Sequence, residues 1–209
     1  MALKTFVKIS NVNNLSDARY CAGMYVNLMG FSLEEGDEYY VSPSEFAEIT
    51  EWLSGLHYVA EFNMSHPDQI LEALQQYRGF DYIQVNEKFH LQLLYNSGYG
   101  LIYNQVIKED KDWDELQTLS VSLKKHNVML NLEADAAREL QPDEKKHLQE
   151  LSKNCDVLLG FGFDAENVEQ ILDQTGVRGI SMKGGHEISP GIKDFDELAD
   201  ILEVLELED

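Results

Sequence analysis

Two glycine-containing turns near the carboxyl end of the chain have the residue types and spacing that phosphate binding uses. The first stands in DVLLGFGFDAENV (156–168) and the second in VRGISMKGGHEISPGIKD (177–194), each directly after an apolar run. Because glycine has no Cβ, backbone N–H groups around it can approach an anion closely. We therefore expect a phosphate to be bound by these residues: Gly160, Phe161, Gly162, Phe163, Lys183, Gly184 and Gly185.

Charged side chains beside these turns could assist the binding of an anion. Asp164 is expected to cap the following helix, so that the positive helix end faces the same place. Lys183 could supply a point charge to a phosphate, and the alternative is a structural ion pair with Glu187 or Glu133. His186 follows the second glycine pair and is either an exposed loop residue or a proton donor to the ligand.

The sequence predicts that repeated βα units position these residues. Short β-rich runs recur along the chain, and each is followed by a polar-capped amphipathic segment, which is the pattern of a parallel sheet covered by helices. The predicted strands are 5–10, 27–33, 56–62, 82–87, 100–107, 128–133, 156–161 and 178–183. Eight such units predict a single (β/α)8 TIM barrel spanning residues 1–209, in which the last two strand ends usually bind phosphate.

Several predicted strands alternate apolar and polar residues, although buried parallel strands are normally apolar throughout. The apolar side must face the helices, so the polar side points into the barrel. We expect these groups to line a wet ligand site, and the alternative is an internal polar network that satisfies itself. The polar positions are Lys8, Ser10, Gln84, Asn86, Asn131, Glu133, Ser181 and Lys183.

Composition limits the partners of the chain. A formal charge of -22 over 209 residues opposes binding to nucleic acid and to anionic membrane surfaces. The two cysteines have no short spacing, so reduced thiols are expected, and the chain shows neither a signal-peptide core nor a membrane-length apolar run. These features predict a cytoplasmic protein. The six histidines show no paired metal-ligand spacing, so we expect neither a metal nor a cofactor.

Several motifs together resemble one enzyme family. GFGFDAENV followed by KGGHEISPGIKD is similar to the end of phosphoribosylanthranilate isomerase, the barrel enzyme of tryptophan biosynthesis. VKISNVNNLSDA (7–18) and YYVSPSE (39–45) resemble its opening strand and the start of its second helix. The resemblance covers the chain in order and implies a phosphorylated sugar substrate. It also implies an Amadori rearrangement, in which an acid opens the ribose ring and a base moves a carbon-bound proton.

The chain departs from the family pattern where the chemistry is expected. The family's base is a cysteine in a K-I-C-G pattern, and Ser10 occupies that position here. Its acid is an aspartate ending the sixth strand, where this chain has Asn131, which cannot transfer a proton. Glu133 lies two residues further on the same face. The family's arginine falls on Tyr39, and a charged, helix-like segment (134–151) replaces its glycine-rich loop.

Three hypotheses remain open at this stage. The first is a relative that binds another phosphorylated small molecule, with weak or lost isomerase activity. The second is a working isomerase with altered acid and base residues, and the third is a non-catalytic binding or interaction protein. Either a monomer or a homodimer is expected. The catalytic candidates are Ser10, Asn131, Glu133 and His186, and the candidates for lining the substrate are Lys8, Tyr39, Gln84, Asn86 and Ser181.

Overall fold

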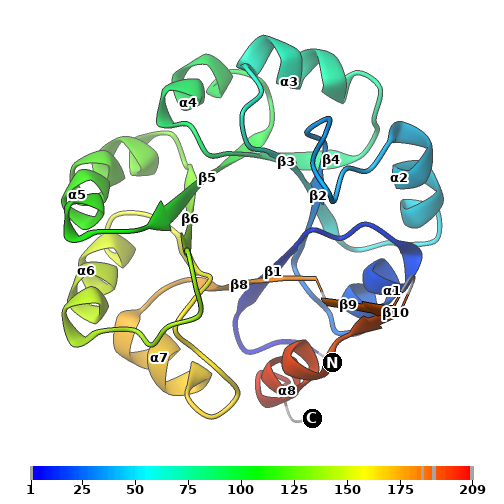
Figure 1. The fold of residues 1–209 in the computed structure, drawn as a ribbon. Helices are drawn as coiled ribbons and strands as arrows, with labels where there is room; N and C mark the ends of the chain where they lie inside the picture. Colours follow the sequence, from blue (N-terminus) through cyan, green and yellow to red (C-terminus); the bar gives the residue numbers. More distant parts are fainter. Residues whose placement is uncertain (1, 185, 190–191, 208–209) are drawn as a thin grey trace.

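The structure is a computed structural model that describes residues 2–184, 186–189 and 192–207. Its strands form one closed barrel in which every strand pairs with the next along the chain and the eighth pairs in parallel with the first. The predicted (β/α)8 barrel is confirmed (Figure 1). The strands are β1 Phe6–Ser10, β2 Leu28–Ser32, β3 His57–Phe62, β4 Phe80–Val85, β5 Gly100–Ile107, β6 Met129–Ala134, β7 Val157–Leu159 and β8 Gly179–Lys183.

One helix follows each barrel strand, and together the helices surround the barrel (Figure 1). Sequence signals explain several of their starts. The Ser42 backbone N–H donates to Glu45 Oε2 at 2.9 Å and the Glu45 N–H donates to Ser42 Oγ at 3.4 Å, which is a complete capping box. The helices are α1 Leu15–Gly23, α2 Pro43–Thr50, α3 Pro67–Leu74, α4 Lys88–Leu94, α5 Asp110–Lys125, α6 Pro142–Ser152, α7 Val168–Thr175 and α8 Asp196–Val204.

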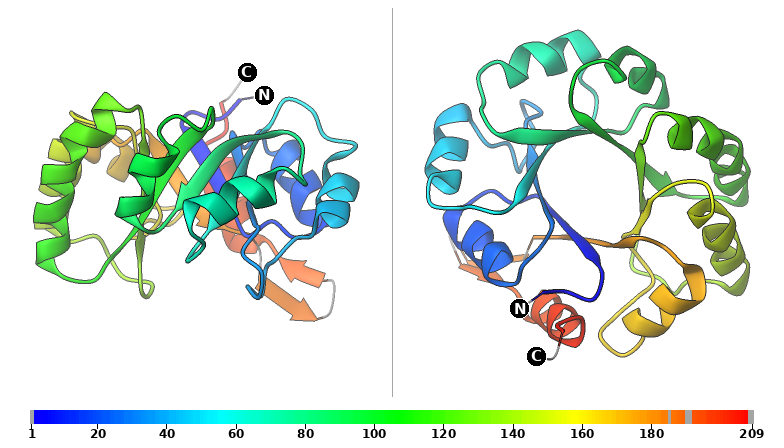
Figure 2. Two further views of the ribbon diagram at one scale, coloured as in Figure 1. Left: turned by 90° about the horizontal axis from the view of Figure 1, so that it is seen from above. Right: turned by 180° about the vertical axis from the view of Figure 1, so that it is seen from behind.

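Two segments differ from the sequence prediction. The charged segment 134–151 is helical only from Pro142, so that residues 135–141 form an open loop after β6. Between β8 and α8 the chain forms an antiparallel hairpin, β9 His186–Ser189 and β10 Ile192–Asp194. Figure 2 (left) shows this hairpin projecting from the end of the barrel opposite to the chain termini. The hairpin therefore stands beside the carboxyl ends of the strands.

The barrel interior has an apolar floor and a polar upper part. Near the amino ends of the strands, an interior cluster closes the barrel with Leu28, Val59, Ile102, Met129 and Leu158. Above it, the buried polar side chains include these: Lys8, Ser10, Ser32, Glu61, Gln84, Asn104, Asn131 and Ser181. The prediction that polar residues point into the barrel is confirmed. The polar groups are buried around the upper axis, which is the end where active sites of such barrels lie.

Candidate active site

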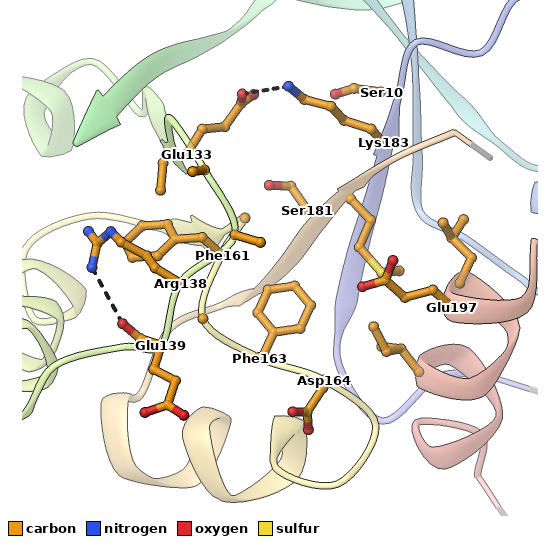
Figure 3. Close-up of a pocket in the computed structure, with 18 of the residues that line it drawn as sticks. Ser10, Glu133, Arg138, Glu139, Phe161, Phe163, Asp164, Ser181, Lys183 and Glu197 are labelled. Atoms are coloured by element: carbon orange, nitrogen blue, oxygen red, sulfur yellow. Dashed lines mark hydrogen bonds and ion pairs between the residues drawn. The ribbon is translucent and has the colours of Figure 1, made fainter. Parts of the chain in front are cut away.

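A cavity of about 670 Å³ opens at the carboxyl ends of β6, β7 and β8 and reaches the first turns of α8. We call it the mouth cavity. It is lined by Ser10 of β1, by the loop after β6, by residues 160–164 after β7, and by residues 181–184 at the end of β8 and just beyond it (Figure 3). Most residues predicted to bind phosphate, together with Ser10, Glu133 and Ser181, are thus brought together at one site.

The first glycine turn (160–163) offers backbone donors to this cavity. Gly160 N–H donates to Leu132 O at 2.8 Å and is therefore not available to a ligand. Phe161, Gly162 and Phe163 line the cavity, and their N–H groups bond to no other residue in the described part of the chain. Gly162 has a φ of 79°, a conformation that favours glycine. Three successive backbone N–H groups can therefore donate to an anion.

Asp164 does not cap the helix as predicted. Its Oδ1 accepts hydrogen bonds from Glu166 N at 2.9 Å and Asn167 N at 3.0 Å, while Asp164 N donates to Asn167 Oδ1 at 3.0 Å. These bonds close a turn that leads directly into α7, because Val168 N–H donates to Asp164 O at 3.0 Å. The helix itself begins at Val168 with Asn167 as its N-cap residue, so the Asp164 side chain caps the preceding turn and not the helix.

The second glycine turn contributes less backbone than expected. Gly184 lines the cavity, but its N–H donates to Ser10 O at 2.8 Å, so that this group is already used. Its φ also lies outside the positive region. Gly185 lies outside the described residues, and for His186 only the backbone at the start of β9 is described. The anion-binding donors of the described site therefore belong mainly to the first turn.

Lys183 lines the mouth cavity and directly precedes the second glycine turn. Its Nζ lies 3.2 Å from Glu133 Oε2, and its side chain remains 63% exposed. Figure 3 shows the two side chains extended toward each other across the cavity. The ion pair with Glu133, one of the two alternatives foreseen for this lysine, is formed. Because the lysine is largely solvated, a ligand phosphate can still approach its ammonium group.

Ser10 is bonded within a buried cluster that sequence analysis did not identify. Ser10 Oγ donates to Glu61 Oε1 at 2.7 Å, and Lys8 Nζ donates to both Ser10 Oγ and Glu61 Oε1. Lys8 has no exposed surface and Glu61 is 7% exposed. The alternation of β3 places Glu61 on the same side as Val59 of the barrel floor, so the sequence did contain a signal for it.

Asn131 lies inside the barrel rather than at the mouth cavity. It is fully buried, and its Nδ2 donates to Asn104 Oδ1 at 2.6 Å. Glu133, two residues further along β6, does line the cavity and is the carboxyl group nearest to the predicted acid position. The remaining predicted substrate-lining residues, which the structure places away from this cavity, are Lys8, Tyr39, Gln84 and Asn86.

Arg138 shapes the loop after β6 and had no recognisable signal in the sequence. Its guanidinium donates to both carboxylate oxygens of Glu144 at 2.7 Å and stacks 4.6 Å from the centre of the Phe161 ring. Burial raises the pKa of Glu144, but hydrogen bonds from Arg138 and from Gln141 N–H outweigh it, so that the pKa is lowered overall. These contacts fix the loop against the first glycine turn.

The mouth cavity is lined by more carboxylates than cations. Among the described residues its cations are Lys183 and Arg138, and Arg138 is already paired with Glu144. Electrostatics therefore oppose a polyanion, and the groups here that favour an anion are the amides of the first turn and Lys183. The carboxylates that line the cavity are Glu133, Asp135, Glu139, Asp164, Asp194 and Glu197.

Comparison with known proteins identifies the family. The family model described as N-(5'-phosphoribosyl)anthranilate (PRA) isomerase matches residues 7–204. The chain belongs to the phosphoribosylanthranilate isomerase family. It is 24% identical over 198 residues to the enzyme of Nitrosomonas eutropha, and the aligned residues cover 92% of each protein. It is also 24% identical over 202 residues to that of Aquifex aeolicus, covering 94% of this chain and 96% of the relative.

Solved structures of the phosphoribosylanthranilate isomerase family share the fold. The Thermotoga maritima enzyme superposes with a TM-score of 0.77 at 18% identity, covering 96% of this chain and 98% of that one. Another family structure superposes with a TM-score of 0.76, at the same identity and coverage, and contains reduced 1-(o-carboxyphenylamino)-1-deoxyribulose 5-phosphate. In the described part of this family member, no helix could cross a membrane and no cluster of metal ligands occurs.

Proposed function

We propose that this family member binds a sugar phosphate in the mouth cavity and has weak or no activity in the family's standard isomerisation. The observation that supports binding most directly is the run of backbone N–H groups at Phe161, Gly162 and Phe163, which have no partner among the described residues. Lys183 stands at the same cavity and can add a charged hydrogen bond. A related structure contains a deoxyribulose 5-phosphate derivative, which is the same class of ligand.

The loss of isomerase activity is supported by the two positions where the family pattern has its acid and base. Ser10 replaces a thiol, and its hydroxyl already donates to Glu61. Asn131 has no titratable proton and is bonded to Asn104 inside the barrel. Without the acid, opening of the ribose ring loses a contribution of about 100-fold to 10,000-fold, and a serine hydroxyl is a poorer base than a thiol.

A working isomerase with a relocated acid is the second candidate function. It is favoured by Glu133, which lines the mouth cavity and shares a strand face with Asn131. Growth of a strain that lacks the isomerase, with this protein as its only replacement, would support this candidate. Without such growth, the binding experiment below separates ligand binding from a purely structural or interaction role.

Titration calorimetry with D-ribulose 5-phosphate and with D-ribulose tests the proposal. The phosphorylated sugar should bind at least about 10-fold more tightly, since charged hydrogen bonds contribute about 1.5–3 kcal/mol. Lys183→Ala should weaken the binding of ribulose 5-phosphate but not that of ribulose. Lys145→Ala is the matched control, because Lys145 lies on α6 and its Nζ bonds to Gln174 Oε1 at 2.9 Å, away from the cavity. Equal affinity for both sugars, or none for either, would refute the proposal.

A further inference from the structure

The buried cluster of Lys8, Ser10 and Glu61 has features that a purely structural ion pair does not need. Glu61 Oε1 accepts hydrogen bonds from Lys8 and Ser10 together, and Asn11 N–H lies 3.4 Å from Glu61 Oε2. Burying two charged groups is costly even when they are paired. A barrel closed by aliphatic residues at this level would avoid that cost, so the cluster calls for a functional explanation.

The fold makes specific room for the Glu61 carboxylate. A Cβ placed on Gly30 of β2 would lie 2.1 Å from Glu61 Oε1 and 2.9 Å from Glu61 Oε2, so an added side chain would force the carboxylate to move. β2 is the neighbour of both β1 and β3 in the barrel. The absent side chain at Gly30 thus lets a carboxylate from β3 reach a hydroxyl on β1, two strands away.

Ser10 connects this carboxylate to the mouth cavity. It is the member of the cluster that lines the cavity, while Glu61 and Lys8 lie behind it. A hydroxyl group has one proton to donate and two lone pairs that accept. Ser10 donates to Glu61 and accepts from Lys8, so that one lone pair remains for a group in the cavity. A proton can therefore pass from the cavity to Glu61 through Ser10.

We propose that Ser10 and Glu61 form a proton relay that removes and returns a carbon-bound proton of an open-chain ketose phosphate bound in the mouth cavity. This inference rests on the proposed function, because the sugar must first bind there. It assigns a role to Glu61, a residue on β3, and it names a half-reaction that needs no ring-opening acid. Since Asn131 cannot protonate a ring oxygen, the open-chain ketose is the form that this site can process.

The proposed step balances in atoms and electrons. The C–H bond beside the ketone breaks, and its proton goes to Ser10 Oγ while the Ser10 proton moves to Glu61 Oε1. The electron pair of that bond forms the carbon–carbon double bond of an enediolate, whose oxygen takes the negative charge. Reversal moves the proton from Glu61 to Ser10 and the Ser10 proton back to carbon. In D2O the returned proton can be a deuteron, so exchange reports the step.

Proton NMR in D2O with D-ribulose 5-phosphate tests the relay. The loss of signal from the protons beside the ketone should be faster with the protein than in buffer alone. Ser10→Ala removes the relay hydroxyl but leaves the Lys8–Glu61 ion pair, and should slow the catalysed exchange by at least about 100-fold. Gly30→Ala keeps both charges but displaces the Glu61 carboxylate, and should slow it likewise. Ser54→Ala, on an exposed loop, is the matched serine control.

Affinity measured in the same samples separates this inference from the proposed function. Slowed exchange in Ser10→Ala and Gly30→Ala, with unchanged Kd for ribulose 5-phosphate and unchanged exchange in Ser54→Ala, would establish the relay. A variant that failed to fold would lose binding as well as exchange. Slower exchange at an unchanged Kd therefore cannot be explained by unfolding. If the parent binds ribulose 5-phosphate without catalysing exchange, or Ser10→Ala exchanges as fast as the parent, the relay is refuted while sugar phosphate binding stands.

Discussion

Gly162 and Leu140 approach so closely that a Cβ at position 162 would lie 2.9 Å from the Cβ of Leu140. This contact joins the turn after β7 to the loop after β6, and both line the mouth cavity. The Arg138 guanidinium, stacked on Phe161, joins the same two segments. The shape of the cavity therefore depends on the mutual packing of two loops, and substitutions at this contact should alter ligand binding.

Gly162→Ala should abolish stabilisation by phosphate. The new Cβ must displace Leu140, and it also disfavours a φ of 79°, so the amides of the first turn move. The φ change alone should cost about 1–2 kcal/mol of unfolding free energy. In the parent, phosphate at 100 times its Kd should add about 2.7 kcal/mol, which is seen as a rise in Tm.

Gly176→Ala is the matched control for this experiment. Gly176 has a φ of 66°, but nothing lies within 4 Å of an added Cβ, and the residue does not line the mouth cavity. The control should lose only the stability that the φ change costs, and should keep the phosphate response. Chloride at matched ionic strength corrects for screening of the -22 charge. A phosphate response that survives in Gly162→Ala would argue against binding by the first turn.

Purified protein should turn over phosphoribosylanthranilate only at trace rates. The loss should be mainly in kcat, because the missing groups act on the transition state rather than on substrate binding. Steady-state assays that follow the fluorescence of the substrate measure this directly. Rates comparable to those of active family members would contradict the expectation and would favour Glu133 as a relocated acid.

Restoring the two family side chains should not restore isomerisation. In Ser10→Cys with Asn131→Asp, the new carboxyl group would lie against Asn104, inside the barrel rather than at the mouth cavity. The loop after β6 would still be held by Arg138 and Glu144 in place of a glycine-rich loop. Misplacing a reactant by about 1 Å can cost 100-fold in rate. A single-turnover rate of the double mutant clearly above that of the parent would show that only these two side chains were missing.

The Arg138–Glu144 pair should make stability depend on pH. Because the pKa of Glu144 is lowered in the folded protein, its contribution is present above the unfolded pKa and is lost as pH falls through the folded pKa. Glu144→Gln should therefore lower the free energy of unfolding at pH 7, by about 1–2 kcal/mol. The difference from the parent should shrink toward pH 3. Urea unfolding at several pH values measures it.

Asp143→Asn provides the control for the pH experiment. Asp143 forms an exposed ion pair with Lys146 on the same helix, and such pairs add little to stability. This variant should unfold like the parent at pH 7. If the difference in unfolding free energy between Glu144→Gln and the parent stays constant as pH falls, Glu144 acts through packing and not through its charge.

Much of the fold could be predicted from the sequence, because it depends on local patterns. The alternation of polar and apolar residues in strands such as β6 identified both the strand and its inward face, with Asn131 correctly placed inside the barrel. The capping box at Ser42 likewise marked the start of α2. These signals depend on near neighbours in the chain, and the structure confirms them.

The site was harder to predict, because its contacts join distant segments. Glu61 bonds to Ser10, 51 residues away, and the space for it is created by Gly30, whose role is invisible in the sequence. The sequence predicts Gly184 as a phosphate donor, but in the structure its N–H donates to Ser10 O. Glycine spacing indicates where a backbone can approach a ligand, but not which N–H groups other strands already use.

An NMR titration of the backbone amides with inorganic phosphate shows whether the first glycine turn binds phosphate. In ¹⁵N-labelled protein, the amide resonances of Phe161, Gly162 and Phe163 should shift and saturate together, because these groups lack partners among the described residues. The Gly160 and Gly184 amides, which donate to carbonyl groups, should shift much less, and chloride at equal ionic strength should move none of them comparably. Phosphate shifts that match those with chloride, or that do not saturate, would contradict a phosphate site at the mouth of this barrel.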